Sequence, residues 1–178
     1  FYNEFGTNQK MDLNTVFSGT LNDLLLENID IITTNNTSVV GKIQFNNLFK
    51  STSDNFKMDA YFQKIASNYP DLILLLPRVL GNSIPSDFGL LGRFDMRGTA
   101  KVSNSAIKTV MDIKTDIGTL FVDLNLDQIK DLDNSSYEGQ VQFTDFDLGR
   151  LMGVQKIGLV TSSLGVQGRG FDKETINS

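Results

Sequence analysis

The stretch RFDMRGTAKVSNSAIKTVMDIKTDIGTLFVDLNLD, residues 93–127, decides the fold class of this chain. Apolar or small residues alternate with polar or charged ones along 94–102, 107–117 and 120–126, and Asn104-Ser105 forms a turn between the first two runs. Alternation with period two is typical of β-strands that have one dry face and one wet face. The stretch therefore predicts successive strands of an amphipathic, antiparallel sheet.

Similar runs extend in both directions from this stretch. They cover 11–17, 21–33, 39–45 and 56–62 before it, and 137–143 and 157–171 after it. Together they predict about ten strands, many of them longer than the usual five to six residues.

Three segments leave their local structure open. Residues 21–33 carry apolar residues on both phases, which indicates either a strand covered on both faces or a bulge near Glu27-Asn28. Residues 148–154 are compatible with a short helical turn. Residues 157–171 are compatible with two short strands or one long strand.

One segment changes from strand to helix spacing. Pro70 and Asp71 are helix start signals, and Gly81 is a stop signal. Between them, Leu72, Leu75, Leu76, Val79 and Leu80 recur at helical spacing, with Pro77 as a kink. The sequence predicts one short helix over 70–80, lying at a rim of the sheet or over its dry face.

Short patterns recur along the chain. Phe17–Leu21, Met96–Ala100 and Val166–Gly170 share a central Gly, and Gly41–Leu48 parallels Gly139–Phe146. We interpret 1–178 as a single fragment of a longer repetitive β protein, with both ends cut. The approximate repeats are 10–64 and 88–148, with a third beginning near 157 and helix 70–80 between the first two.

Composition argues against several classes of function. The chain has no Cys, His or Trp, and its net charge is -5. This removes imidazole bases, thiol nucleophiles and the usual zinc sites, and no basic face for nucleic acid is visible. Asp131–Ser135 departs from a calcium loop, because Ser136 and Gln142 stand where that loop needs Gly and Glu. We predict no catalytic residue, no metal site, no cofactor and no enzymatic activity.

The dry face has two interpretations. It is either the core of a closed β-sandwich or an open, curved, U-shaped groove that holds acyl chains. The pattern alone does not decide between them. The candidate lining residues of a lipid groove share the apolar phase of their strands: Phe56, Met58, Phe62, Phe94, Met96, Val102, Ile107, Met111, Ile113, Leu120, Val122, Leu124, Val141 and Phe143.

Several motifs together resemble the TamB and AsmA-like family, especially TamB-like chains of Bacteroidota. They are Leu72–Pro77 before a long strand pair, Gly98 between amphipathic strands, and Thr115–Leu120 entering a strand. Tyr137–Val141 leading to Phe146–Leu151, and the closing Leu164–Phe171, belong to the same pattern. The likeness covers most of the chain from about Phe17 onward.

The resemblance implies an elongated, all-β fold with one short helix, a β-taco or repeated β-groove. It also implies a section of a periplasmic chain that is anchored in the inner membrane and reaches the outer membrane. The implied activity is conduction of phospholipids between the two membranes. A TamA-like outer-membrane barrel is the implied partner, through regions outside this fragment.

Two other functions remain open from the sequence. The sheet could be a chaperone or binding module that assists outer-membrane protein assembly by strand pairing at its edges. It could instead be a closed β-sandwich with a structural role.

Overall fold

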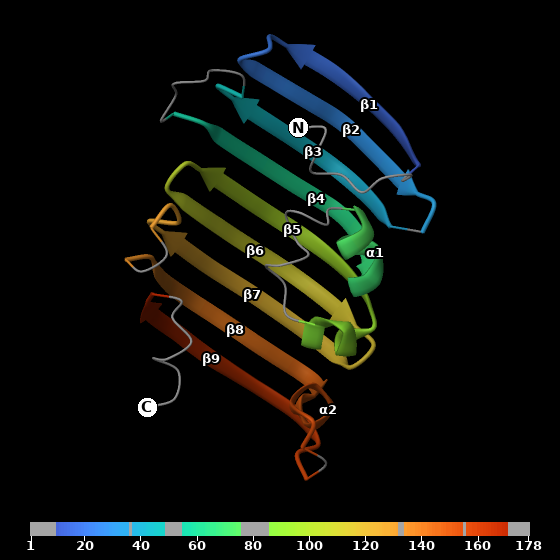
Figure 1. The fold of residues 1–178 in the computed structure, drawn as a ribbon, viewed down its shortest axis with the longest axis vertical. Helices are drawn as coiled ribbons and strands as arrows, with labels where there is room; N and C mark the ends of the chain where they lie inside the picture. Colours follow the sequence, from blue (N-terminus) through green and yellow to red (C-terminus); the bar gives the residue numbers. More distant parts are fainter. Residues whose placement is uncertain are drawn as a thin grey trace.

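The computed structural model describes residues 10–35, 37–48, 55–75, 86–131, 134–154 and 156–170. Within them, nine strands form one antiparallel sheet in the order β1 to β9, so that each strand pairs with the next one in the chain (Figure 1). Eight spacings of about 4.8 Å give a sheet about 40 Å across. The sequence pattern predicts about ten strands, and the described residues form nine.

The elements follow one another along the chain with short connections between several strands. Their bounds are β1 Met11–Gly19, β2 Asp23–Thr33, β3 Ser38–Asn46, β4 Lys57–Asn68, α1 Tyr69–Leu75, η1 Ser86–Leu91, β5 Arg93–Ser103, β6 Ala106–Thr115, β7 Gly118–Asp127, β8 Ser136–Asp147, α2 Leu148–Met152 and β9 Leu159–Arg169.

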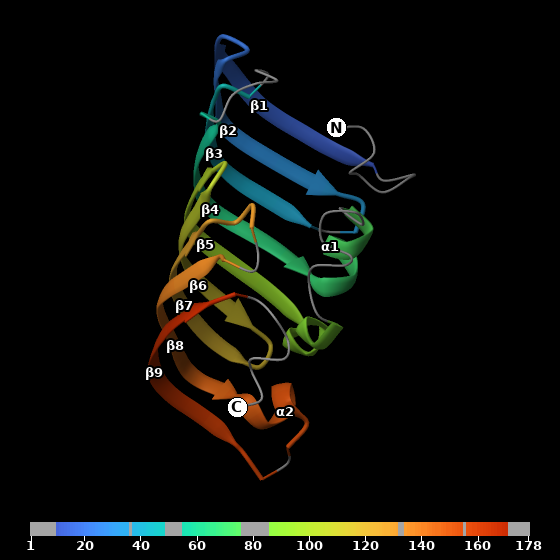
Figure 2. The same ribbon diagram turned by 60° about the vertical axis from the view of Figure 1, so that its left-hand side comes forward.

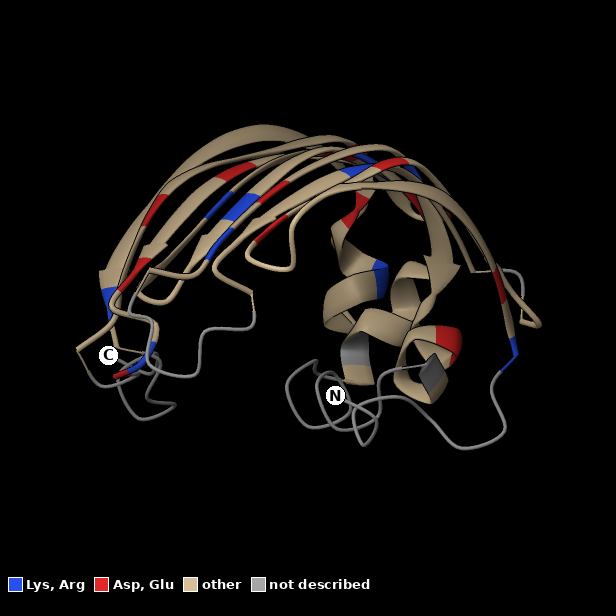
Figure 3. Ribbon diagram, turned by 90° about the horizontal axis from the view of Figure 1, so that it is seen from above, with Lys and Arg blue, Asp and Glu red and all other residues tan. Residues whose placement is uncertain are grey.

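The sheet is curved and does not close on itself. Figure 3 shows it as an arch, and α1, the 3₁₀ helix η1 and α2 lie on the concave side. Figure 2 shows these three helical segments near the same ends of the strands. The predicted fold class, an all-β curved sheet, is confirmed, and the closed sandwich is wrong because the described strands form a single sheet.

The register assigns one side of every strand to the concave side. Leu120 and Phe143 are paired, and both pack against a core that includes Leu91 of η1. Since directly paired residues point to the same face, the pairings extend this face across all nine strands. We call it the inner face and the opposite side the outer face.

The inner face takes alternate residues from each strand. They are Met11, Leu13, Phe17 and Gly19 of β1; Leu24, Leu26, Ile29, Ile31 and Thr33 of β2; Val39, Gly41, Ile43 and Phe45 of β3; Met58, Ala60, Phe62, Ile65 and Ser67 of β4; Phe94, Met96, Gly98, Ala100 and Val102 of β5; Ile107, Thr109, Met111, Ile113 and Thr115 of β6; Gly118, Leu120, Val122, Leu124 and Leu126 of β7; Tyr137, Gly139, Val141, Phe143 and Phe146 of β8; and Val160, Ser162, Leu164, Val166 and Gly168 of β9.

Register shifts keep apolar residues on this face where the simple alternation fails. In β2 the shift lies between Leu26 and Ile29, where Asn28 has a φ of 53°. Asn tolerates this left-handed conformation better than most residues do. The extra residue at this bulge places Ile29 and Ile31 on the same face as Leu26. Of the two structures predicted for 21–33, a bulged strand or a strand covered on both faces, the bulged strand is therefore correct.

Among the described residues, a cluster of buried apolar side chains lies at the helical end of the sheet. Phe146 is fully buried and meets the ring of Phe143 edge-on, with 5.3 Å between the centroids. Leu91 of η1 and Ile117 complete this core, and Leu148 and Leu151 of α2 pack against it. These contacts fix two helical segments to one end of the inner face.

Backbone hydrogen bonds hold the same region together. The amide of Asp116 donates to the Leu91 carbonyl at 3.0 Å, and the amide of Arg93 donates to Asp116 Oδ2 at 3.0 Å. Asp147 starts α2, because its Oδ1 accepts from the Arg150 amide at 2.9 Å. The helical end is therefore joined to β5, β7 and β8 by polar as well as apolar contacts.

Gly98 is needed for close approach between β5 and β6. Its φ is 150°, and a Cβ atom there would collide with the Val110 carbonyl oxygen. The Met111 sulfur would lie only 3.0 Å from that Cβ atom. Met111 therefore covers the gap that Gly98 leaves in the inner face.

The predicted helix is present, with a shifted start. The helix over 70–80 begins at Tyr69 and is described to Leu75, and 76–85 lie outside the described residues. It is preceded by Asn68, whose Oδ1 accepts from the Asp71 amide at 2.9 Å. Residues 148–154 do contain a helical turn, α2.

The second approximate repeat, 88–148, does not open on a strand, because Phe88 lies in η1 and β5 begins at Arg93. The η1 segment carries Leu91 into the core, and this tertiary contact overrides the local strand pattern. Residues 159–169 form the single strand β9. For 157–171 the sequence allowed two short strands or one long strand, and the one long strand is correct. The repeat boundaries stay a prediction.

Candidate functional site: the inner face

The inner face is mostly apolar and carries no charged residue at any of its positions in the nine described strands. Cross-strand pairing arranges its side chains in ladders that run perpendicular to the strands. The central ladder passes from Phe62 through Gly98 and Met111 to Val122 and Val141. This path crosses β4 to β8 without meeting a charged residue.

Two further ladders flank the central one. Toward the helical end, Ile65, Met96, Ile113, Leu120 and Phe143 are paired in succession. Toward the other end, the succession is Met58, Val102, Ile107, Leu126 and Tyr137.

The structure brings the sequence-predicted lining residues together. Thirteen of the fourteen are inner-face positions of β4 to β8, and the remaining one, Phe56, directly precedes β4. The Phe56 ring lies 6.5 Å from that of Phe45, an inner-face residue of β3. The predicted set therefore forms one surface, and its role as a lipid groove is taken up below as a proposal.

The inner face is only partly covered. Phe94 and Phe146, near the helical segments, are buried. Farther from these segments, Met58, Met111 and Val122 keep part of their surface exposed. The described residues include no second sheet over this face. Apolar side chains across several strands thus remain in contact with solvent, and large exposed apolar surfaces of this kind are typical of binding sites.

The outer face is polar and carries three exposed ion pairs between neighbouring strands. Lys42 Nζ lies 3.4 Å from Glu27 Oε1, Arg97 Nε lies 3.2 Å from Asp112 Oδ2, and Lys101 Nζ lies 3.2 Å from Asp59 Oδ1. These pairs are exposed, and exposed pairs add little to stability. The two faces therefore differ in polarity, because the charged side chains of the strands lie on the outer face and the inner face carries none.

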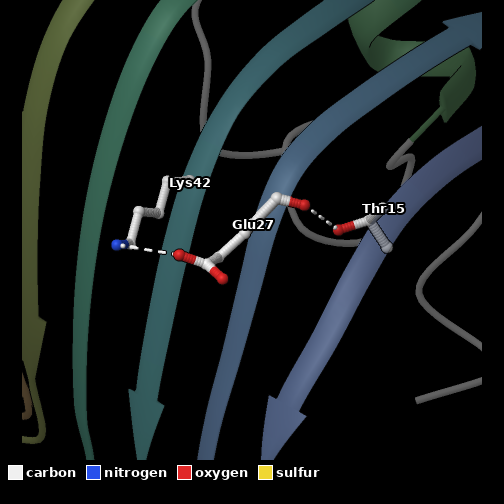
Figure 4. A network of polar contacts seen from close by, with 3 residues as sticks. All are labelled: Thr15, Glu27 and Lys42. Carbon is white, nitrogen blue, oxygen red and sulfur yellow. Dashed lines mark hydrogen bonds and ion pairs between the residues drawn. The ribbon is translucent and has the colours of Figure 1, made fainter.

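Figure 4 shows one outer-face pair, Lys42 with Glu27, across β3 and β2. In the same view, the hydroxyl of Thr15 on β1 donates to the Glu27 carbonyl at 2.9 Å. This side-chain bond ties β1 to β2 where their register shifts between Asn14 and Val16.

The lining set predicted from the sequence omits inner-face residues of β2, β3, β4 and β9. They include Leu26, Ile29, Ile43, Ile65 and Leu164. The signal was present for Ile43, which alternates with polar neighbours. It was hidden for Ile29 and Ile65, because each follows a bulge that changes the phase.

Comparisons with known proteins give no match. No protein-family model, no curated protein and no solved structure matches this chain. Within the described residues, no helix has the length and hydropathy needed to span a membrane. The same residues contain no cluster of three or more potential metal-ligating acidic, His or Cys side chains.

Proposed function

We propose that this chain is a section of a periplasmic bridge whose apolar inner face conducts phospholipids between the inner and outer membranes. The observation that carries the proposal is the uninterrupted, uncharged and only partly covered inner face. The resemblance to TamB and AsmA-like proteins supports the same function. The chemistry needed is binding and sliding, so no catalytic residue is involved.

The energetic basis is the burial of acyl chains. Each methylene removed from water contributes about 0.8 kcal/mol. The inner face offers a series of similar apolar ladders, so an acyl chain moving from Phe62 toward Val141 meets no charged residue. Binding that is comparable at each step favours movement along the face.

The two ends of the strands differ in a way that orients the lipid. The helical end is closed by the core around Phe146. The other end, with Met58, Val102 and Leu126, is where β5 turns into β6 through polar residues such as Asn104. We place the headgroup in water at this second end, with the acyl chains directed toward the helical segments.

Native mass spectrometry of the chain tests the proposal. The expected spectrum contains the 19.8 kDa chain with one or more phospholipids, either from the expression host or after incubation with phosphatidylethanolamine vesicles. A chain that stays free of lipid under both conditions, while circular dichroism shows an intact sheet, would contradict it.

A second candidate function rests on the two ends of the sheet. Within the described residues, β1 and β9 each pair with one neighbour only. An unpaired strand presents backbone donors and acceptors to another strand. A chaperone that assists outer-membrane protein assembly would use these edges, and its client binding would not depend on the inner face.

A further inference from the structure

A row of helical segments closes one end of the inner face. The 3₁₀ helix η1 contacts both α1 and α2, while α1 also contacts β4 and α2 also contacts β9. Figure 2 shows the three segments near the same ends of the strands. The packing between α1 and η1 is close, because a Cβ atom on Gly89 would lie 3.6 Å from the Tyr69 ring. The helical segments therefore follow the strand ends from β4 to β9.

The inner-face residues beside these segments are buried. Phe94 of β5 is 7% exposed, and Phe146 of β8 is fully buried. Leu91 of η1 packs with Phe146, and the paired residues Leu120 and Phe143 pack against this core. We call Leu91, Phe94 and Phe146 the wall. Protein cores are packed to the density of organic crystals, so the space behind the wall cannot take an acyl chain.

Four inner-face rows on β5 to β8 lie between the wall and the opposite strand ends, and we call them the open strip. Its first and last rows contain Val102 and Met96 of β5, and Leu126 and Leu120 of β7. These four residues all keep part of their surface exposed. The two residues of each strand are six positions apart. At about 3.4 Å per residue, the open strip measures about 20 Å along the strands.

The end of the open strip that lies away from the wall suits a headgroup. Tyr137 of β8 is in its first row, paired with Leu126. A Cβ atom on Gly168 would collide with the Tyr137 ring, so the ring lies over Gly168 on the inner face. Tyr has an apolar ring and a polar hydroxyl, a combination that suits a boundary between an apolar surface and water. This boundary fixes where the acyl chain begins.

The length of the open strip matches a particular acyl chain. An extended saturated chain advances about 1.25 Å per carbon, because C–C bonds of about 1.5 Å meet at about 111°. About 20 Å therefore corresponds to about 16 carbons. We infer that the wall makes the inner face selective for acyl chains of up to about this length. The inference rests on the proposed function, in which the acyl chains point toward the helical segments.

A competition between phospholipids of different length tests the inference. The wild-type chain is incubated with vesicles that hold equal amounts of saturated phosphatidylethanolamines of about 12, 16 and 20 carbons per chain, a range centred on the expected limit. Native mass spectrometry then measures the bound species. We expect similar amounts of the two shorter lipids. The longest should be at least about 100-fold rarer, because each methylene left in water lowers the affinity about fourfold.

A substitution beside the wall should shorten the preferred chain. Ile113 is paired with Met96 in the last row of the open strip, and Ile113→Trp fills that row. Losing one row removes about 7 Å, or about five carbons, so the lipid of about 16 carbons should become at least about tenfold rarer than that of about 12. The matched control is Val110→Trp, on the outer face of the same strand, which should keep the wild-type profile.

The possible failures of the inference and of the proposed function are distinguishable. Equal binding of the lipids of about 16 and 20 carbons by the wild-type chain would overturn the length limit and leave lipid binding intact. A folded chain that binds none of them would overturn both. If Ile113→Trp does not fold by circular dichroism, Met96→Trp fills the same row in its place. If neither variant folds, the profile of the wild-type chain decides alone.

Discussion

A Val122→Arg variant should stay folded and lose most of its bound lipid. Val122 lies in the central ladder between Met111 and Val141, on a face that is partly exposed. An Arg side chain there can reach water, so the sheet survives, but its guanidinium occupies the acyl path. Displacing two methylenes at about 0.8 kcal/mol each weakens phospholipid binding by about tenfold or more. Titration with phospholipid followed by native mass spectrometry measures the change.

The matched control is Val110→Arg. Val110 is also partly exposed and belongs to the neighbouring strand β6, but it lies on the outer face, opposite Asp123 of β7. This variant should bind lipid like the wild-type chain. Full lipid binding by a folded Val122→Arg protein would exclude the inner face as the lipid path. Met111→Arg, directly opposite Val122, should repeat the loss.

A Phe146→Ala variant should lose about 3–5 kcal/mol of the free energy of unfolding. Phe146 is fully buried, and its ring meets Phe143 edge-on beside Leu91 and Ile117. Removing the ring leaves a cavity in the core that attaches η1 and α2 to the sheet. Urea unfolding followed by circular dichroism measures the change.

The control for this prediction is Phe17→Ala. Phe17 is an inner-face residue of β1 and is 59% exposed, so its removal should cost about 1 kcal/mol or less. A similar loss of stability in both variants would show that the helical end is no more tightly packed than the edge of the sheet.

The sequence was sufficient to predict the sheet because most strands follow simple alternation. In β5, β6 and β7, every apolar-phase residue from Phe94 to Leu126 lies where the period of two places it. The turn at Asn104-Ser105 and the helix start near Pro70 were also readable, since their residues have local conformational preferences.

The features that sequence reasoning missed depend on contacts between distant residues. The bulge at Asn28 changes the phase of β2, but the pattern alone did not distinguish it from a strand buried on both sides. Phe88 precedes an apolar, strand-like segment, and η1 forms instead because Leu91 packs against Ile117 and Phe146. Closed and open forms of the dry face share one pattern, so only the three-dimensional arrangement separates them.

Photo-crosslinking from adjacent residues of β7 tests the central claim most directly. A benzophenone side chain at position 122 points to the inner face, and the same group at position 121 points to the outer face, opposite Asp112 and Gln142. With phospholipid-loaded protein under ultraviolet light, we expect crosslinked lipid from position 122 and little or none from position 121. Equal crosslinking from both positions, or crosslinking from position 121 alone, would contradict a lipid path along the inner face.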